Sequence, residues 1–256
     1  MGYREDRSAL GDKTLEQMFG AGPTARSTPL LNSKRDFVGA EVWTRPGLTL
    51  QERWLITLTC VAQASNAAEN DRYVHGALRS KALTLQEMRE FVLHFAVYCG
   101  WSKAELLDEA VSRAADALGL EEPAEPPALS LEPAERQARG VACWLSVMTF
   151  PPSPPNEPYT SAGILNFVFG EMWDRPGLGR KARRFVTMAA VGLNDANSPI
   201  MAHVYASLKS GDVSLAEMEE FILQFALYAG WPKASEMQGC TRQVAKRMAE
   251  GASLFG

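Results

Sequence analysis

The sequence predicts an all-α protein built from two tandem copies of one helical unit. Apolar residues recur at helical spacing, and no stretch shows the regular alternation that is typical of a half-buried strand. Residues 84–101 and 214–231 are identical at 11 of 18 aligned positions, which indicates an internal repeat. Of the 256 residues, 46% are hydrophobic and 22% are charged, as expected for a chain with a packed core.

The repeat keeps one register along each copy. At a constant offset of 130 residues, "EVWTRPGL" (41–48) aligns with "EMWDRPGL" (171–178), and no gap is needed before the block at 84–101 and its counterpart at 214–231. We therefore infer a tandem duplication, with a first unit at residues 1–120 and a second at 134–256. Residues 121–133, "EEPAEPPALSLEP", are rich in proline and glutamate and are expected to form an exposed linker.

Each copy is expected to contain about five or six helices. "QERWLITLTCVAQA" (51–64) and "KARRFVTMAAVGLN" (181–194) are mostly apolar and predict buried helices, each preceded by an "RPGL" turn. Thr84 and Ser214 are predicted N-caps, because a glutamate follows each of them three residues later. Gly100 and Gly230 are expected to end these helices. One unit is too small to bury all these apolar residues, so we expect the copies to pair and the chain to oligomerise.

The bulk properties exclude several classes of protein. A net charge of -4 provides no basic surface for nucleic acid, and no apolar run is long enough to span a membrane. The first residues lack the apolar core of a signal peptide. The four cysteines show neither a metal-ligand spacing nor a CxxC pair, so free thiols in a reducing cytosol are expected. We therefore expect a cytoplasmic protein that acts on a small molecule.

Both copies carry motifs of a known family. "WTRPGLTLQERWLITLT" (43–59) and "WDRPGLGRKARRFVTMA" (173–189) resemble the entry motif of the carboxymuconolactone decarboxylase family. The later family motif resembles "HVYASLKSGDVSLAEMEEFILQFALYAGWP" (203–232), so the resemblance covers nearly the whole chain, once per copy. It implies two all-α domains packed as a pseudo-dimer, with no metal and no organic cofactor. Because family members often form hexameric rings, it also implies a homo-oligomer, either a trimer of two-domain chains or a dimer.

The wider superfamily includes thiol peroxidases that partner alkyl hydroperoxide reductase. Those proteins carry a CxxC shortly before the family histidine. By the resemblance, His203 occupies that histidine position in this chain, and Tyr73 is its counterpart in the first copy. Seven and four residues before these two positions stand Ala196, Pro199, Asn66 and Glu69. Without a thiolate at these positions, the peroxidase reaction is disfavoured.

Histidines are the first candidates for proton transfer near neutral pH. His203 occupies the family's histidine position and is a candidate catalytic residue. Tyr73, its counterpart, is a candidate substrate-binding residue, and so are His75 and Tyr205, which correspond to each other. Two residues along a helix correspond to about 200° of rotation, so His75 does not share a face with Tyr73.

His94 lies in the context "HFAVYCG", which resembles a pattern that family members often carry. Glu90 and Tyr98 lie four residues before and after it, so all three share one helix face. A carboxylate beside the imidazole would raise its pKa and fix its tautomer, and Tyr98 could donate to a substrate oxygen. The second copy has Glu220, Gln224 and Tyr228 instead, which can form hydrogen bonds but cannot exchange a proton in the same way. The alternative is a buried polar network that joins adjacent helices.

The remaining candidates belong to the substrate-binding class. Arg53 and Arg183 occupy the family's basic position after "RPGL". They either bind a substrate carboxylate or form structural salt bridges, for which Glu41 and Glu171 are the expected partners. Trp43 and Trp173 are expected in a pocket wall or in the core.

Three functional hypotheses follow. The first is a cofactor-free lyase of the decarboxylase type for a small cyclic carboxylate or lactone, in which His203 or His94 moves the proton and an arginine holds the anion. The second is an isomerase or cyclase that tailors secondary metabolites, and the third is a non-catalytic binding protein. Because the polar positions differ between the copies, we predict two non-equivalent sites, or one composite site, rather than two identical ones.

Overall fold

The computed structural model describes residues 3–20, 26–126 and 132–252, and it confirms the all-α prediction, since no strand occurs in these ranges. The first half contains α1 (Tyr3–Phe19), α2 (Pro29–Ser33), the π-helical segment η1 (Lys34–Val42), α3 (Leu50–Gln63), α4 (Ala67–Arg79), α5 (Leu85–Cys99) and α6 (Trp101–Leu118). The second half contains α7 (Pro133–Met148), the π-helical segment η2 (Tyr159–Met172), α8 (Arg180–Leu193), α9 (Asn197–Ser210), α10 (Leu215–Ala229) and α11 (Trp231–Ala249).

The helices α8, α9, α10 and α11 begin 130 residues after α3, α4, α5 and α6, which is the offset read from the sequence. The division into two repeat domains with a linker at 121–133 stays a prediction, and residues 127–131 of that linker lie outside the described ranges.

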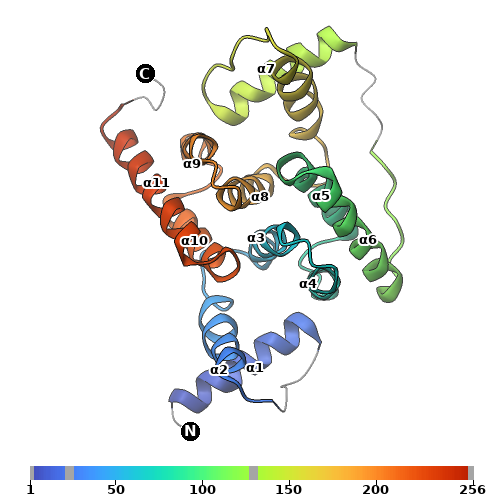
Figure 1. The fold of residues 1–256 in the computed structure, drawn as a ribbon, viewed down its shortest axis with the longest axis vertical. Coiled ribbons are helices and arrows are strands. Elements are labelled where there is room, and N and C mark those ends of the chain that lie inside the picture. The colour runs from blue at the N-terminus through green and yellow to red at the C-terminus, as the bar shows by residue number, and fades with distance from the viewer. Residues whose placement is uncertain (1–2, 21–25, 127–131, 253–256) are drawn as a thin grey trace.

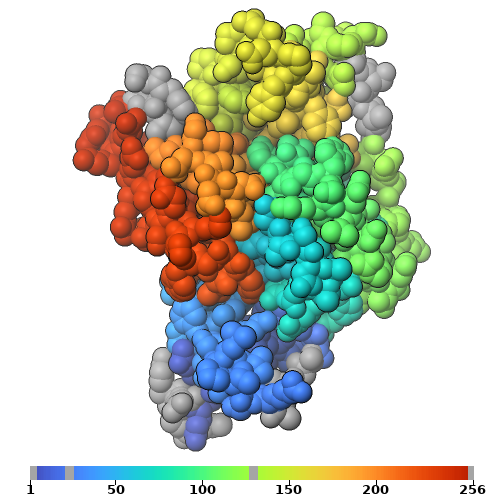
Figure 2. Space-filling model, viewed as in Figure 1, coloured from blue at the N-terminus to red at the C-terminus, as the bar shows by residue number. Residues whose placement is uncertain are grey.

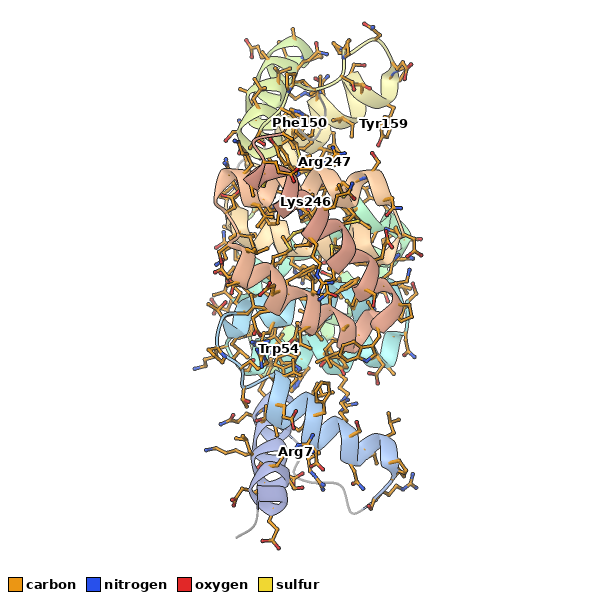
Figure 3. The ribbon with its side chains drawn as sticks, turned by 90° about the vertical axis from the view of Figure 1, so that its left-hand side faces the viewer. Arg7, Trp54, Phe150, Tyr159, Lys246 and Arg247 are labelled. Carbon is orange, nitrogen blue, oxygen red and sulfur yellow. The ribbon has the colours of Figure 1, made fainter. Side chains whose placement is uncertain are left out.

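The two apolar helices α3 and α8 lie together at the centre of the molecule (Figure 1). Each also packs against a helix of the other half, because α10 contacts α3 and α5 contacts α8. The pairs α1–η1 and α7–η2 form the two ends of the elongated molecule, as the side view and the space-filling view show (Figures 2 and 3). Chain segments far apart in sequence therefore meet around the central pair.

The hydrophobic core also crosses between the halves. One cluster of buried residues consists mainly of first-half side chains and includes Leu178, Ala182 and Val186. A second cluster consists mainly of second-half side chains and includes Leu48, Ile56 and Cys60. Neither half therefore buries its apolar residues by itself. In the ranges that the structure describes, no helix is both long and apolar enough to cross a membrane.

The predicted ends of α5 and α10 are confirmed. Thr84 and Ser214 accept hydrogen bonds from the backbone N–H groups of Glu87 and Glu217, and each glutamate bonds back to the cap residue. Gly100 follows α5 with φ 97°, a conformation that a side chain would strain. It also precedes the first residue of α6, so one glycine ends one helix and starts the next. Gly230 does the same between α10 and α11, with φ 93°.

The Ser214 cap provides a test of local stability. Ser214→Ala should lower the free energy of unfolding by about 1 kcal/mol, because the N-terminal turn of α10 loses its side-chain acceptor. Ser214→Thr is the matched control, since threonine caps α5 at the corresponding position. Urea unfolding monitored by circular dichroism gives both values. Equal stability of the alanine variant and the unmodified chain would contradict a stabilising cap.

Candidate functional site

The candidate residues form two corresponding groups, and each group takes one helix from the opposite half. The group that we call the His203 site consists of Glu90, His94 and Tyr98 on α5 with Trp173, Arg183, Arg184, Thr187 and His203 of the second half. The group that we call the Tyr73 site consists of Glu220, Gln224 and Tyr228 on α10 with Lys34, Trp43, Arg53, Thr57 and Tyr73 of the first half.

Arg183 is buried, and its guanidinium group joins the backbone at Arg175 to two side chains of α5. Nη2 donates to the carbonyl oxygen of Arg175 at 2.9 Å and lies 3.3 Å from Oε2 of Glu90. Nη1 lies 3.3 Å from Nδ1 of His94. The "RPGL" turn that begins at Arg175 is therefore held against α5 by a buried cation.

Arg53 repeats this arrangement in the Tyr73 site. Nη2 donates to the carbonyl oxygen of Arg45 at 2.8 Å and lies 3.5 Å from Glu220, while Nη1 donates to Oε1 of Gln224 at 3.0 Å. In each site the glutamate also binds a second arginine. Arg45 binds Glu220, as Arg175 binds Glu90.

The expected salt-bridge partners of these two arginines were therefore wrong. Glu41 pairs with Arg7 at 2.6 Å and Glu171 pairs with Arg136 at 2.5 Å. The physical reason is tertiary packing, because helix α5 or α10 of the other half brings a different carboxylate to each arginine.

Both ring nitrogens of the buried His94 have protein partners. A guanidinium group has no acceptor atom, so Nδ1 must accept the hydrogen bond from Arg183. Nε2 then carries the proton in the neutral ring and donates to Oγ1 of Thr187, 2.9 Å away. Arg183 and Thr187 together fix the tautomer.

The expectation that Glu90 raises the pKa of His94 was wrong. Burial holds the pKa of His94 well below its ordinary value, and the positive charge of Arg183 lowers it further. Glu90 is instead engaged by Arg175 and Arg183, at 2.7 and 3.3 Å.

Gln224 forms the same two hydrogen bonds at the corresponding position of the Tyr73 site. Its Oε1 accepts from Arg53, as Nδ1 of His94 accepts from Arg183. Its Nε2 donates to Oγ1 of Thr57 at 3.0 Å, as Nε2 of His94 donates to Thr187. A glutamine amide can thus replace the neutral imidazole in this network without losing a bond.

His203 lies among aromatic rings and has an unused polar atom. Its ring is 5.8 Å from the Tyr98 ring, edge to face, and 6.5 Å from the Trp173 ring, nearly parallel. Nδ1 is buried and has no hydrogen-bond partner among the described residues. Burial lowers the pKa of His203 to about 3, and the charge of Arg184 adds to this effect. The imidazole is therefore neutral near pH 7.

Tyr98 is oriented by Trp173, whose Nε1 donates to the tyrosine hydroxyl at 2.8 Å. Burial raises the pKa of Tyr98 to about 12, so the side chain remains a phenol. Since its oxygen already accepts one hydrogen bond, its O–H group is the part that can donate to a substrate.

Arg184 completes the His203 site, and the sequence interpretation missed it. The side chain is fully buried, its Nε donates to Asp212 at 3.0 Å, and the guanidinium lies 5.3 Å from the centre of the Trp173 ring. Its Nη1 is buried without a hydrogen-bond partner in the described residues. The sequence did contain a sign of this role, because "RR" at 183–184 aligns with "RW" at 53–54, so the second half carries an arginine that the first half lacks at this position.

The Tyr73 site repeats the aromatic arrangement with different polar groups. Trp43 donates to the hydroxyl of Tyr228 at 3.0 Å, and the Tyr228 ring packs edge to face against Tyr73 at 5.9 Å. Lys34, which the sequence interpretation also missed, lies with its Nζ 3.3 Å from the Tyr73 hydroxyl. Its counterpart in the second copy is Ile164.

His75 and Tyr205 are not among the residues of the two groups defined above. His75 is half-buried on α4, and helical geometry turns it about 200° away from Tyr73. Tyr205 is half-buried on α9 and packs against the second hydrophobic cluster.

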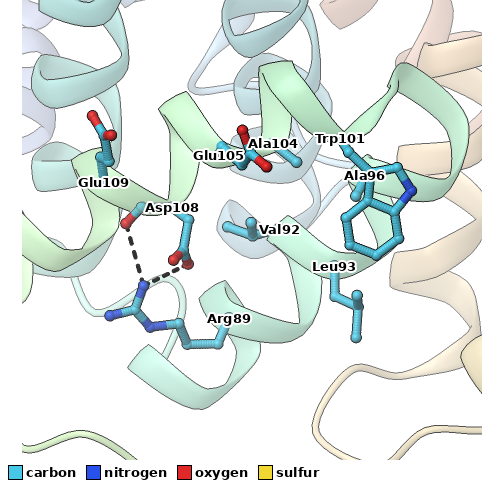
Figure 4. Close-up of a pocket in the computed structure, with 9 residues that line it drawn as sticks. All are labelled: Arg89, Val92, Leu93, Ala96, Trp101, Ala104, Glu105, Asp108 and Glu109. Carbon is cyan, nitrogen blue, oxygen red and sulfur yellow. Dashed lines mark hydrogen bonds and ion pairs between the residues drawn. The ribbon is translucent and has the colours of Figure 1, made fainter.

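An open groove of about 510 Å³ lies on the outer side of α5 and α6 (Figure 4). Trp101 lies at one end of it, and Arg89 binds Asp108 across it. No candidate residue lines this groove. A smaller groove of about 150 Å³ lies at the corresponding place on α10 and α11. Within the described ranges, no three His, Cys, Asp or Glu side chains lie close enough together to hold a metal ion.

Comparison with known proteins agrees with the motifs. The family described as "Carboxymuconolactone decarboxylase family" matches residues 158–242. A 4-carboxymuconolactone decarboxylase from Acinetobacter baylyi is 35% identical over 83 residues, which are 32% of this chain and 61% of that protein. A nitrosuccinic acid decarboxylase from Metarhizium robertsii is 33% identical over 100 residues, which are 39% of this chain and 68% of that protein.

The chain belongs to the carboxymuconolactone decarboxylase family, as its sequence predicted. It matches less than two thirds of the length of the Acinetobacter relative.

The hydrogen bonds of His94 predict how substitutions affect stability. His94→Gln should change the free energy of unfolding by less than about 1 kcal/mol, since Gln224 shows that an amide can form both bonds. His94→Leu should cost about 3 kcal/mol, because Arg183 and Thr187 lose their partner inside the protein. Urea unfolding at pH 7 measures both changes, and Gln224→Leu is the matched variant of the other site. Similar losses for glutamine and leucine at residue 94 would contradict this explanation.

The lowered pKa values of His94 and His203 predict a pH dependence. Below their ordinary pKa of 6.5, both histidines take up a proton in the unfolded chain but not in the folded protein. Stability is therefore complete above about pH 6.5 and falls as the pH decreases, by about 1.4 kcal/mol per pH unit for each histidine, with the His203 contribution continuing to about pH 3. His94→Gln should lose about 1.4 kcal/mol less per pH unit than the unmodified chain between pH 6 and 5. If the difference in stability between His94→Gln and the unmodified chain does not change with pH, His94 is protonated to the same extent in the folded and unfolded states, and this explanation is contradicted.

Proposed function

We propose that this protein is a cofactor-free lyase that removes carbon dioxide from a small carboxylate bearing an electron-withdrawing group, such as a lactone. Family membership and two relatives that are named decarboxylases support the reaction type. The observation that carries the proposal is the pair of buried polar atoms without protein partners, Nδ1 of His203 and Nη1 of Arg184. Unpartnered buried polar atoms are costly, so the pair is the part of the His203 site that a polar substrate would satisfy.

The substrate class follows from the names of the two relatives. One acts on a carboxylated lactone and the other on nitrosuccinic acid, and both compounds combine a carboxylate with a group that can accept negative charge. Loss of carbon dioxide moves the negative charge from the carboxylate to this acceptor group. A cation lowers the barrier only if it stabilises the acceptor group more strongly than the carboxylate. We therefore assign Nη1 of Arg184 to the oxygen atoms of the acceptor group.

His203 supplies the proton that the reaction consumes. In the overall change, RCOO⁻ and H⁺ become RH and carbon dioxide, so the carbon that loses the carboxylate must gain one proton. The imidazole is neutral near pH 7, and a bound anion next to it raises its pKa, which allows it to take up a proton from solvent. It then delivers this proton to the carbon from Nδ1, while the Tyr98 hydroxyl donates a hydrogen bond to a substrate oxygen.

The other predicted residues receive supporting roles in this proposal. The polar atoms of His94, Glu90 and Arg183 bind one another or the protein, so these three side chains position α5 and with it Tyr98. Trp173 forms the wall next to His203. The Tyr73 site has the corresponding wall, Trp43, but Tyr73 and Trp54 replace His203 and Arg184. Nε1 of Trp54 is also buried without a hydrogen-bond partner among the described residues, but it belongs to a neutral indole, so this site lacks both the imidazole and the second buried cation. Only the second-copy site is assigned this reaction.

Access to the His203 site requires movement. His203 is 8% exposed and Arg184 is fully buried, so the surrounding side chains must shift before a substrate can reach Nη1. A closed site also excludes water, which strengthens the attraction between Arg184 and the developing negative charge.

Assembly and location stay predictions. The expected homo-oligomer, a trimer of two-domain chains or a dimer, would have apolar surface to cover, since Trp101 and Trp231 are 56% and 58% exposed at corresponding positions. The cytoplasmic location rests on the sequence alone.

The test uses the purified chain with 4-carboxymuconolactone and with nitrosuccinic acid, and measures the release of carbon dioxide. His203→Asn should lower kcat/KM by about 10²- to 10⁴-fold, because the proton donor is lost. Arg184→Met should lower kcat/KM by a comparable factor, mainly by lowering kcat, because the cation that stabilises the developing negative charge is lost. His75→Asn, a matched histidine variant outside the network, should leave kcat/KM within about twofold.

Three results would contradict the proposal. The first is unchanged turnover in a His203→Asn variant whose circular dichroism and urea unfolding match those of the unmodified chain. The second is a rearranged product without carbon dioxide release, which would favour the isomerase or cyclase hypothesis. Binding of both compounds without any turnover would favour the non-catalytic hypothesis.

A further inference from the structure

Lys34 has an environment that is unusual for a lysine. It lies on η1 at the Tyr73 site, and its Nζ is 3.3 Å from the Tyr73 hydroxyl. The same nitrogen lies 5.5 Å from the centre of the Phe19 ring and 5.7 Å from that of the Tyr73 ring. No carboxylate forms an ion pair with Lys34 in the part of the chain that the structure describes.

The neighbouring charges disfavour the protonated amine. Burial lowers the pKa of Lys34, and the guanidinium of Arg72, which lies 4.3 Å from the centre of the Phe19 ring, lowers it further. Glu69 opposes this effect but pairs with Arg72 at 3.9 Å. The other titratable groups are the phenols of Tyr73 and Tyr228, whose pKa values burial raises, so they add no negative charge. A lysine that is poorly solvated and close to another cation is activated as a nucleophile.

We propose that Lys34 forms an imine with the carbonyl carbon of a small aldehyde or ketone, at a covalent site distinct from the His203 site. The neutral Nζ attacks the carbonyl carbon to give a carbinolamine, which loses water to leave a C=N bond to Nζ. In balance, the carbonyl compound and the neutral lysine amine become an imine and one water molecule. The Tyr73 hydroxyl, within hydrogen-bond distance of Nζ, donates the proton to the departing hydroxyl group and recovers it from the nitrogen.

Two further features fit this site. Lys34 is half-buried rather than fully buried, so part of its side chain remains exposed to solvent. Trp43 fixes the Tyr228 hydroxyl, and the Tyr228 ring packs on Tyr73, so the acid beside the amine is held in place. The His203 site has Ile164 in the position of Lys34, so this chemistry is specific to the first copy.

Reductive trapping tests the proposal. The purified chain is incubated with propanal or with pyruvate, plus cyanoborohydride, at pH 7.5, and the reduced adducts are located by peptide mass spectrometry. A lowered pKa leaves more neutral amine at this pH, so Lys34 should be modified several-fold faster than the exposed Lys13. A larger preference for pyruvate than for propanal would indicate that Arg72 binds the carboxylate of the carbonyl compound.

Variants provide the controls. Lys34→Arg should abolish the fast adduct, while Lys13→Arg should leave its rate unchanged. Tyr73→Phe should slow the modification of Lys34 several-fold, because the proton donor is lost, and circular dichroism should show that this variant stays folded. Equal modification of Lys34 and Lys13, or a fast adduct that persists in Lys34→Arg, would overturn the proposal.

Discussion

Two buried arginines, Arg53 and Arg183, determine how the two halves of this protein fit together. A buried guanidinium is costly unless its donors are matched, and each of these arginines finds its acceptors in the "RPGL" turn of its own half and on a helix of the other half. This requirement fixes α5 against α8 and α10 against α3. The tyrosines at the ends of α5 and α10 are placed by the same contacts, so the aromatic walls of both sites depend on them.

The shared framework carries two different sets of reactive groups. His94 and Gln224 form equivalent hydrogen bonds, so this difference, which is conspicuous in the sequence, leaves the network intact. Other positions differ in the kind of reactive group that they carry. His203, Arg184 and Ile164 of one site correspond to Tyr73, Trp54 and Lys34 of the other. One framework can carry both sets of side chains, because a fold does not determine the reaction that it supports.

The two sites differ in the charge that they offer a ligand. The His203 site holds a buried guanidinium beside a neutral imidazole, an arrangement suited to an anion whose charge moves during the reaction. The Tyr73 site holds an amine beside the Tyr73 hydroxyl and the Phe19 ring, which suits an uncharged carbonyl carbon. In both sites a tryptophan N–H orients a tyrosine whose raised pKa keeps it a proton donor. The π-helical segments η1 and η2 lead directly to these tryptophans, in keeping with the frequent occurrence of such segments at functional sites.

The sequence by itself determined the helical class, the capped starts of α5 and α10, the glycines that end them, and the offset of 130 residues between corresponding helices. These features depend on hydrogen bonds and apolar spacing within a few residues, which the order of amino acids specifies directly. Only the tertiary structure decided which carboxylates pair with Arg53 and Arg183, why the pKa of His94 is lowered, and that Arg184 and Lys34 belong to the sites. Those outcomes depend on contacts such as His94 with Thr187, 93 residues apart, and Arg53 with Gln224, 171 residues apart, and on the burial that such contacts produce.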